Sequence, residues 1–428
     1  MNRTSTNDIS CDYRQMQKNI SQIPIAIVGA GPAGMVAALA LAKNNHACVL
    51  IGQEPNNNDG RTTALMMPAI EILKDLQIWD NLETKATPLS VMRIIDGTKR
   101  LVRSPVVNFR AHEINKPAFG YNIQNNDLNE ALLKSIKKNP LITQIFSSVV
   151  TYDHHDLNVY ITLENGTLLK SALLVAADGR ASLARKAAHI QTQEWTYPQT
   201  AITLSFSHDI PHANISTEFH TEDGPFTQVP LKGNHSSLVW VTNPEYAKYL
   251  LSLSIKELSI IVEEKMHSMI GRIQITTSPQ TWPLSGLIPQ QFAAKRTILV
   301  GESAHVFPPI GAQGLNLGIR DALCLTQSIQ HNISDPGHKN VLSNYNRLRK
   351  PDIWARTGSV HALNYALLSD FLPAQLLRST GLEMLKKISP LRRFFMYEGM
   401  HPGHGFQDAT KTLIELFKNP SFNNFTKT

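Results

Sequence analysis

The chain has 428 residues, of which 42% are hydrophobic and 18% charged, with a net charge of +7. This length exceeds what one compact core organises, so we expect two domains or one domain with a large insertion. No segment approaches the run of about 20 apolar residues that a membrane-spanning helix needs. The positive charge comes without zinc spacing or an arginine-rich block, which argues against nucleic acid and favours anionic lipid or acidic partners. The spacing of the three cysteines matches no metal site or disulfide framework and fits a reducing, cytoplasmic setting.

The first structured segment begins with the apolar, β-branched run Ile23–Val28, and an alanine-rich stretch follows it. This order predicts a strand, a tight turn and a helix, and a second strand over 46–51 starts a parallel sheet. Glycines at such a turn let the backbone approach a pyrophosphate, to which the helix N-terminus presents unpaired N–H groups. The glycines that form this turn are Gly29, Gly31 and Gly34.

The end of the second predicted strand lacks the acidic residue that usually binds a ribose hydroxyl there. Gly52 and Gln53 occupy that place, and Glu54 comes two positions late. Three alternatives remain for the ribose contact: Glu54 reaches around to the ribose, Gln53 substitutes as a neutral partner, or the contact is lost. We therefore assign no residue to the ribose.

The middle of the chain changes character twice. A hairpin is expected over 157–169, and a buried strand over 172–177 leads into Asp178 and Gly179. Apolar and polar residues alternate over 200–245, which predicts antiparallel strands and an inserted sheet. Further helices are expected over 68–79, 127–138 and 254–269, and a strand over 297–300 returns the chain to the first sheet.

The most specific segment follows that returning strand. It places a carboxylate in a small turn, then a proline pair, then three glycines before a helix, so that backbone amides can face an anionic ring edge. Gly318, inside the start of this helix, indicates a closely approaching ligand or backbone. His305 either packs beneath the loop or takes part in catalysis. The candidate cofactor contacts of this segment are Glu302, Gly311, Gln313, Gly314 and Asn316.

These three motifs resemble those of the group A flavoprotein monooxygenases, and within them the hydroxylases of ubiquinone biosynthesis. The run 308–322 is similar to the ubiquinone branch, and the resemblance extends over about 23–400. It implies that Asp178 and Gly179 contact FAD and NAD(P)H, and that Glu302, where the family usually has Asp, holds the ribityl chain. Arg61 lies where the family places an arginine near the isoalloxazine ring.

The implied fold is α/β, with a Rossmann-like FAD-binding domain, an inserted antiparallel substrate sheet as in para-hydroxybenzoate hydroxylase, and a helical C-terminal region. The expected limits are 1–22 for a flexible tail, 23–190 with 295–350 for the FAD-binding domain, 191–294 for the substrate sheet and 351–428 for the C-terminal helices.

The implied activity is FAD-dependent hydroxylation of the ring of a polyprenylated phenol in ubiquinone biosynthesis, through a C4a-hydroperoxyflavin. It requires O₂ and a reductant, either NAD(P)H or a protein donor, and no metal. Because the cofactor carries the chemistry, no catalytic residue is nominated. Two alternatives are a hydroxylase of a small soluble aromatic acid and a non-catalytic flavin-binding scaffold in a biosynthetic complex.

The C-terminal region combines an excess of basic residues with apolar residues at helical spacing. Such helices either lie on an anionic membrane surface, here its inner face, or pack on the FAD-binding domain. The first case implies a peripheral protein whose partners include membrane lipid and other enzymes of ubiquinone biosynthesis. The apolar positions are Val360, Leu363, Leu367 and Phe371 in one stripe, and Leu377, Met384 and Ile388 in another.

Overall fold

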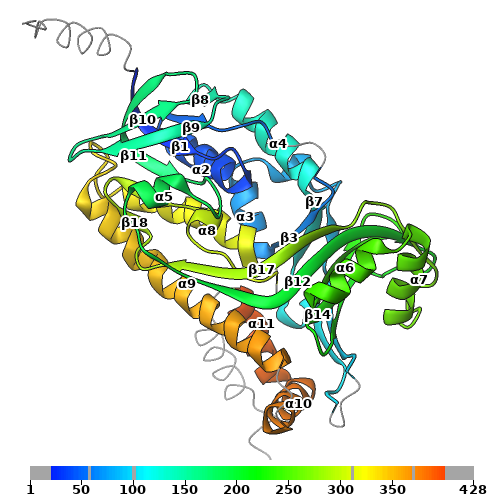
Figure 1. Cartoon of the computed structure of the whole chain (residues 1–428). Helices are drawn as coiled ribbons and strands as arrows, with labels where there is room; N and C mark the ends of the chain where they lie inside the picture. Colours follow the sequence, from blue (N-terminus) through cyan, green and yellow to red (C-terminus); the bar gives the residue numbers. More distant parts are fainter. Residues whose placement is uncertain (1–20, 56–58, 99–102, 310–312, 369–371, 401–428) are drawn as a thin grey trace, which may run out of the picture.

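The computed structural model describes residues 21–55, 59–98, 103–309, 313–368 and 372–400. Two large sheets lie next to each other, and the long helix α9 (Lys339–Leu368) runs from the first toward the second (Figure 1). The α/β class with an inserted sheet and C-terminal helices, predicted from the sequence, is confirmed. Gly311 and the tails 1–20 and 401–428 lie outside the described residues.

The first sheet has the strand order β18-β19-β11-β1-β2-β8. The five strands from β19 to β8 in this order run parallel to one another. Parallel strands are covered on both faces, which is why the core of β1 is a continuous apolar run. β9 and β10 extend the sheet beside β11, and Gly166 turns the expected hairpin with φ +81°. The strands are β1 (Ser21–Val28), β2 (Cys48–Ile51), β8 (Ile142–Ile145), β9 (Val149–His154), β10 (Val159–Leu163), β11 (Leu168–Ala176), β18 (Ala293–Ala294) and β19 (Thr297–Leu299).

Helices cover this sheet. Every residue of α2 from Gly34 to Ala42 is buried, because α2 packs against β1 and β2 and also against α4 and α8. This explains why its sequence is apolar on all sides. The helices of this half are α2 (Pro32–Lys43), α3 (Met67–Asp75), α4 (Asn125–Lys137), α5 (Leu183–Ala187) and α8 (Gln313–Ile329), with 3-10 turns η1 (Trp79–Asn81) and η3 (Gly301–Ser303).

The second sheet has the order β16-β12-β15-β14-β13-β5-β6, and β17 pairs with β12. One face packs on α6 (Pro244–Ser252) and α7 (Ile255–Lys265), where Trp240 is a core residue. A small sheet of β3 (Thr62–Met66), β7 (Gly120–Gln124) and β4 (Thr87–Pro88) lies against the other face. The large-sheet strands are β5 (Val91–Asp96), β6 (Val107–Arg110), β12 (Thr192–His208), β13 (Ile215–His220), β14 (Pro225–Leu231), β15 (His235–Thr242), β16 (Ile273–Ile275) and β17 (Gln280–Pro289).

Three elements, β5, β6 and α9, cross the domain limits expected from the sequence. β5 and β6 belong to the second sheet although they lie within 23–190, and β5 pairs parallel to β13 in an otherwise antiparallel sheet. α9 continues through the expected limit after residue 350, with Pro351 in its interior. The pairing of β5 with β13 arises from packing between distant segments, which local sequence patterns do not encode, whereas α9 continues as one helix across residue 350.

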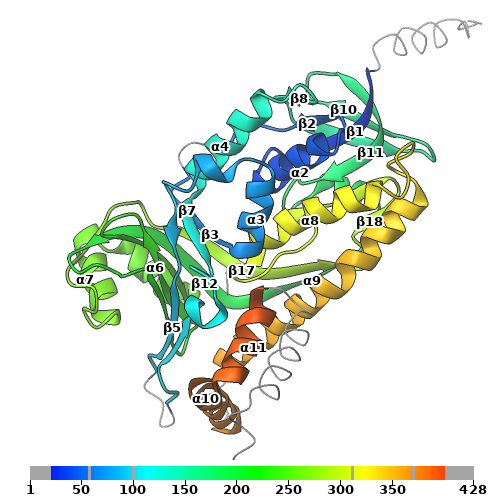
Figure 2. The same ribbon diagram turned by 180° about the vertical axis from the view of Figure 1, so that it is seen from behind.

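The C-terminal helices α9, α10 (Leu372–Lys387) and α11 (Ser389–Met400) turn back toward the second sheet, and α11 lies beside the 3-10 turn η2 (Ala111–Ile114) (Figure 2). Met396 of α11 is buried in a cluster with Phe119, Met66 and Met92. Of the helices described, none combines the length and apolarity needed to cross a bilayer.

Candidate active site

The first glycine motif forms the turn between β1 and α2. A Cβ atom on Gly29, where φ is +112°, would lie 2.0 Å from the carbonyl oxygen of Ala177, so a side chain there is excluded by the neighbouring strand. Gly31 differs, because a Cβ atom there meets nothing within 4 Å, and its position at the N-cap of α2 has no side-chain capping hydrogen bond. An uncapped helix N-terminus beside open space fits a pyrophosphate.

The two candidates for the ribose contact stand at the end of β2. The Gln53 side chain donates to Oγ of Ser148 at 3.2 Å. The Glu54 carboxylate lies 3.9 Å from Nζ of Lys137, and both members of that pair are exposed. Each candidate therefore has a protein partner, and neither contact is assigned to the ribose.

Arg61 lies between the two sheets. Its guanidinium makes a forked hydrogen bond to the Asp59 carboxylate, with both N–O distances 2.7 Å, and its Cζ lies 5.0 Å from the ring centroid of Trp282 on β17. Burial raises the pKa of Asp59, but hydrogen bonds from Arg61 and Asn125 outweigh it and lower the pKa to about 2. The hydrogen bond to Asp59 raises the pKa of Arg61 despite burial, and the charge of Glu302 adds to this. Arg61 is thus within electrostatic reach of the third motif.

The second motif turns the chain from β11 into α5. Oδ1 of Asp178 accepts a hydrogen bond from Ser182 Oγ at 2.5 Å, and Oδ2 accepts one from the backbone N–H of Ala184 at 3.1 Å. The carboxylate therefore stabilises its own turn. Gly179 has φ +79°, and a Cβ atom there meets nothing within 4 Å, which leaves its backbone open to a ligand.

Arg185, which is buried, joins the second motif to the third. Its guanidinium donates to the carbonyl oxygen of Arg180 and to that of Ser303, each at 2.9 Å. Ser303 Oγ in turn donates to the carbonyl oxygen of Ala176 at 2.6 Å. The segment that follows β19 is therefore fixed to the end of β11.

The third motif exposes one carboxylate on a rigid turn. Glu302 is exposed while its neighbours Gly301 and Ser303 are buried. Gly301 has φ +68°, and a Cβ atom on Gly318 would lie 3.3 Å from its Cα and 3.2 Å from Cβ of Ala33. The backbone of Gly301 and the methyl group of Ala33 both approach Gly318, so backbone, one of the two explanations that the sequence left open, is present there together with a side chain.

The start of α8 carries the remaining candidates. Oδ1 of Asn316 accepts from the backbone N–H of Met66 at 2.8 Å, and its Nδ2 donates to the carbonyl oxygen of Ala64 at 2.9 Å, so that Asn316 fastens α8 to β3. Gly314 is exposed, and a Cβ atom there meets nothing within 4 Å. Gln313 begins α8, although its side chain lies outside the description.

Beneath this segment lies a network of buried charges. Asp321, with no exposure, accepts from Arg349 Nε at 2.7 Å, and Nη1 of Arg349 donates to Asp352 at 2.6 Å. Asp352 also contacts the guanidinium groups of Arg320 and Arg356 at 3.0 Å each. Three guanidinium groups and two carboxylates leave one positive charge on these five side chains. Because Asp321 accepts the backbone N–H of Gly301, this positive charge lies directly beneath the third motif.

The sequence did not identify Asp59, Trp282, Asp321 or Arg349 as part of the site. Asp59 precedes Arg61 by two residues, and this spacing of an acid and a base was the available local signal. Trp282 and Arg349 reach the site from β17 and α9, and their positions depend on long-range packing. His305, with 1% exposure, lies 2.8 Å from Asp321 and packs beneath the loop.

The face of the second sheet opposite α6 and α7 is turned toward the FAD half. Thr62 of β3 donates to Ser237 of β15 at 2.8 Å across this boundary. Thr203 shares that face because Ile202 and Leu204 beside it point into the helix-covered core. Its hydroxyl is buried and has no hydrogen-bond partner among the described residues.

Comparisons with known proteins agree with this geometry. The family model of the FAD binding domain matches residues 22–358. The chain is 30% identical to ubiquinone hydroxylase UbiL of Rhodospirillum rubrum, over 88% of this chain and 89% of that protein. It is 26% identical to 3-demethoxyubiquinol 3-hydroxylase of Escherichia coli, over 86% and 96%.

Among solved structures, p-nitrophenol 4-monooxygenase PnpA of Pseudomonas putida superposes with a TM-score of 0.74, covering 89% of this chain and 99% of that one at 18% identity. That likeness establishes the fold. The open glycine positions, the uncapped helix α2 and the exposed Glu302 suit FAD, which when bound supplies oxygen activation and transfer. The chain belongs to the FAD binding domain family, and within it to the FAD-dependent monooxygenases of the ubiquinone-biosynthesis branch.

Proposed function

We propose that this monooxygenase hydroxylates the aromatic ring of a polyprenylated phenol on the path to ubiquinone. The observation that carries the proposal is the relationship to two enzymes named as ubiquinone or demethoxyubiquinol hydroxylases over more than four fifths of each chain. In this proposal Gly29, Gly31 and Gly34 receive the pyrophosphate, and Asp178 with Gly179 borders the cofactor. Glu302 holds the ribityl chain, and the ring lies near Arg61 and the N-terminus of α8, which includes Gln313, Gly314 and Asn316. Gly311, which lies outside the described residues, is proposed as a further contact.

The substrate ring would lie between the flavin and the free face of the second sheet. Thr203 offers a hydroxyl that lacks a described partner, and a buried polar group of this kind is satisfied by a substrate hydroxyl. The protein's contribution is to orient the ring, exclude water and surround the reaction with fixed charges. No further acid or base is assigned.

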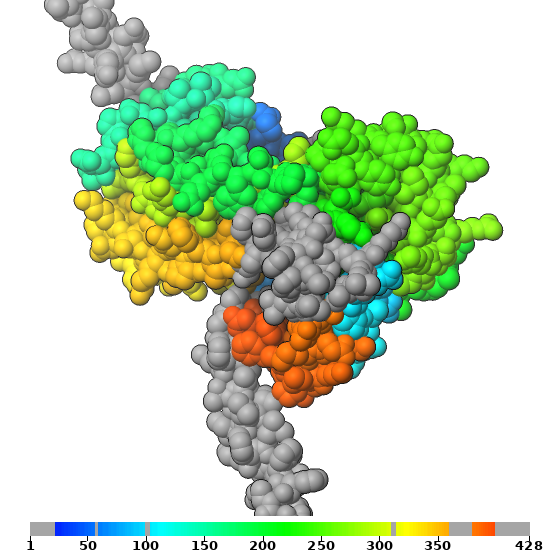
Figure 3. Space-filling view, turned by 60° about the horizontal axis from the view of Figure 1, so that its bottom comes forward, coloured from blue at the N-terminus to red at the C-terminus, as the bar shows by residue number. Residues whose placement is uncertain are grey.

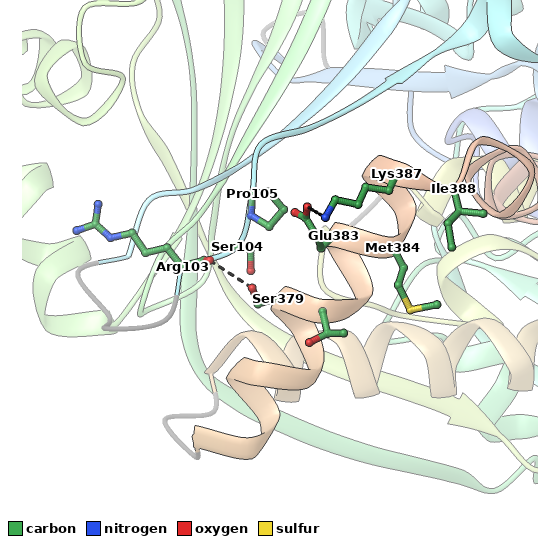
Figure 4. Close-up of a pocket in the computed structure, with 9 residues that line it drawn as sticks. Arg103, Ser104, Pro105, Ser379, Glu383, Met384, Lys387 and Ile388 are labelled. Carbon is green, nitrogen blue, oxygen red and sulfur yellow. Dashed lines mark hydrogen bonds and ion pairs between the residues drawn. The ribbon is translucent and has the colours of Figure 1, made fainter.

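A groove of about 610 Å³ supports a long apolar tail on the substrate. It lies between the segment leading into β6 and helix α10, which are neighbours on the surface (Figures 3 and 4). Met384 and Ile388, which are 46% and 42% exposed, line this groove together with Pro105 and the ion pair of Glu383 and Lys387. Within β6, Phe109 belongs to the cluster that contains Met66, whose backbone N–H donates to Asn316. Methionine-rich surfaces adapt to flexible apolar ligands.

The same region supports contact with an anionic membrane surface. Exposed apolar residues of α10 and α11 stand beside exposed Lys386 and Lys387, and Phe395 is 52% exposed. Such a surface can lie on lipid headgroups without crossing the bilayer. The side chains of Leu377 and of the first stripe, Val360 to Phe371, lie outside the description.

NAD(P)H is the proposed reductant, because the second motif presents the open Gly179 backbone; a protein donor is the alternative. Purified holoenzyme, reduced with NADH or NADPH in the presence of O₂ and a short-chain prenylated phenol, should yield a ring-hydroxylated product. A flavoprotein that consumes neither nicotinamide donor but hydroxylates the phenol once its flavin is reduced photochemically would point to the protein donor. One that forms no product even then would support the scaffold alternative.

Deletion of the gene tests the place of this activity in the cell. The deletion strain should contain less ubiquinone and accumulate a prenylated precursor that lacks one ring hydroxyl. Complementation with the wild-type gene should restore ubiquinone, whereas Gly31→Val should not. Normal ubiquinone together with failure to grow on a simple aromatic acid would replace this proposal with the catabolic one.

A further inference from the structure

Asp321 lies at the centre of the buried charge network and contacts the third motif directly. Its Oδ2 accepts the backbone N–H of Gly301 at 2.9 Å and lies 2.8 Å from Nε2 of His305, while Oδ1 accepts from Arg349. Burial raises the pKa of this carboxyl, but the charges of Arg349 and His305 outweigh burial and lower it. Asp321 is thus a carboxylate with donors on both oxygens.

The turn that carries Glu302 is held from two sides. On one side Asp321 binds the N–H of Gly301, where φ is +68° and the chain reverses. On the other side Ser303 is bound to Ala176 and Arg185. Because both neighbours are fixed, the backbone of Glu302 has one orientation, and its side chain projects from the buried turn.

Arg349 connects this arrangement to α9. It is 1% exposed and bridges Asp321 on α8 to Asp352. A buried carboxylate keeps its charge only while such a partner stays in place, so α9 sets the state of the group that binds Gly301.

We propose that Asp321, held charged by Arg349 and oriented by His305, is the positioning residue that fixes the Gly301–Ser303 turn so that Glu302 can hold the ribityl chain of FAD. In metal sites, residues that orient a metal ligand through a hydrogen bond change metal affinity by about 10- to 100-fold when they are replaced, and Asp321 would orient Glu302 in a similar way. The role concerns cofactor binding and is independent of which phenol is hydroxylated.

The decisive measurement is the FAD dissociation constant of purified protein, beside the urea midpoint of the apoprotein. Asp321→Asn removes the charge and should raise the dissociation constant at least tenfold. Asp335→Asn is the matched control, because Asp335 pairs with the buried Arg296 at 2.7 Å beside the same sheet and, in the described structure, shares no contact with the third motif. It should lower the urea midpoint and leave FAD affinity within threefold of wild type.

His305 supplies variants that keep the buried Asp321–Arg349 pair. His305→Phe removes the donor but keeps a ring beside Phe307, on which His305 stacks at 5.4 Å, and should weaken FAD binding at least threefold. His305→Gln retains a donor toward Asp321 and should bind FAD within twofold of wild type.

Equal FAD affinity in wild type and His305→Phe would overturn the positioning role, and so would equal losses in Asp321→Asn and Asp335→Asn. If Asp321→Asn does not fold, the comparison of FAD affinity between His305→Phe and His305→Gln tests the positioning role by itself. A wild-type protein that binds no FAD would instead refute the proposed function.

Discussion

A Cβ atom on Gly34 would stand 1.9 Å from the carbonyl oxygen of Gly29, whereas one on Gly31, two residues from Gly29, would meet nothing. The glycines of this motif therefore have different structural roles. Gly29 and Gly34 let α2 approach β1, and Gly31 leaves room for the ligand.

This difference gives the first prediction. Gly31→Val should fold with a urea midpoint close to wild type but contain no FAD, because the side chain fills the space proposed for the pyrophosphate. Gly34→Ala should lose both FAD and stability, since backbone must move. Absorbance at 450 nm and urea unfolding separate the two effects, and full FAD occupancy in Gly31→Val would refute the assignment.

The second prediction concerns Asp59 and Arg61. The pKa of Asp59 is about 2 in the folded chain and about 3.9 when unfolded. A lowered carboxyl pKa stabilises the fold above the unfolded value, and this stability is lost as pH falls from about 4 to 2. Its size should be about 1 kcal/mol, because the Arg61 side chain is 44% exposed and solvent screens the pair.

Arg61→Ala should therefore flatten the pH dependence of apoprotein unfolding between pH 4 and 2. Arg93→Ala is a suitable comparison, because Arg93 binds Asn108 and no carboxylate is among its described contacts. An unchanged slope in Arg61→Ala would show that this pair does not set the pKa of Asp59.

The third prediction is a loss of stability in mild acid through His154. Burial lowers the pKa of His154 to about 4, and the charge of Lys295 acts in the same direction. The unfolded chain takes up this proton near pH 6.5 and the folded chain near 4, so the unfolding free energy should fall by roughly 2 kcal/mol across that interval.

His154→Gln can keep the contact to Thr297, which lies 2.9 Å from Nε2 of His154, but has no proton to bind. Its unfolding free energy should vary less between pH 6.5 and 4 than that of wild type. Identical pH profiles for the two proteins would contradict the buried neutral imidazole.

Features that depend on near neighbours could be predicted from the sequence. The turn at Gly29–Gly34, the hairpin at Gly166 and the N-terminus of α7, where Ser254 and Glu257 form a capping box, all follow from residues a few positions apart. Their backbone geometry is fixed by local sterics and hydrogen bonds.

Features that depend on distant segments could not be predicted from the sequence. Nothing local indicates that β5 pairs with β13, because strand register follows from packing on a common core. Asp321 was visible at the end of the third motif, but its partner Arg349 lies 28 residues away on another helix. Local sequence patterns therefore predicted the motifs of the cofactor site but not the buried ion pairs beneath them.

The fourth prediction is that the protein floats with liposomes containing anionic lipid and that added salt weakens this binding. Replacing Lys386 and Lys387 by Glu should abolish flotation, because both face solvent on α10. Replacing Lys248 and Lys256 by Glu reverses the same charge on α6 and α7 and should have little effect. Failure to float under any lipid composition would leave packing against β6 and η2 as the role of these helices.

The last prediction concerns the length of the substrate tail. If the groove beside α10 receives an isoprenoid chain, each buried CH₂ contributes about 0.8 kcal/mol, and loss of a few such contacts is a large change in KM. Ile388→Glu should raise the KM of a long-chain phenol at least tenfold and leave that of a short-chain analogue within twofold. Ile260→Glu is the matched control, because Ile260 is 49% exposed on α7, away from the groove, compared with 42% for Ile388. Equal effects on both substrates would show that the tail leaves by another route, while turnover of the short analogue would still report the ring chemistry.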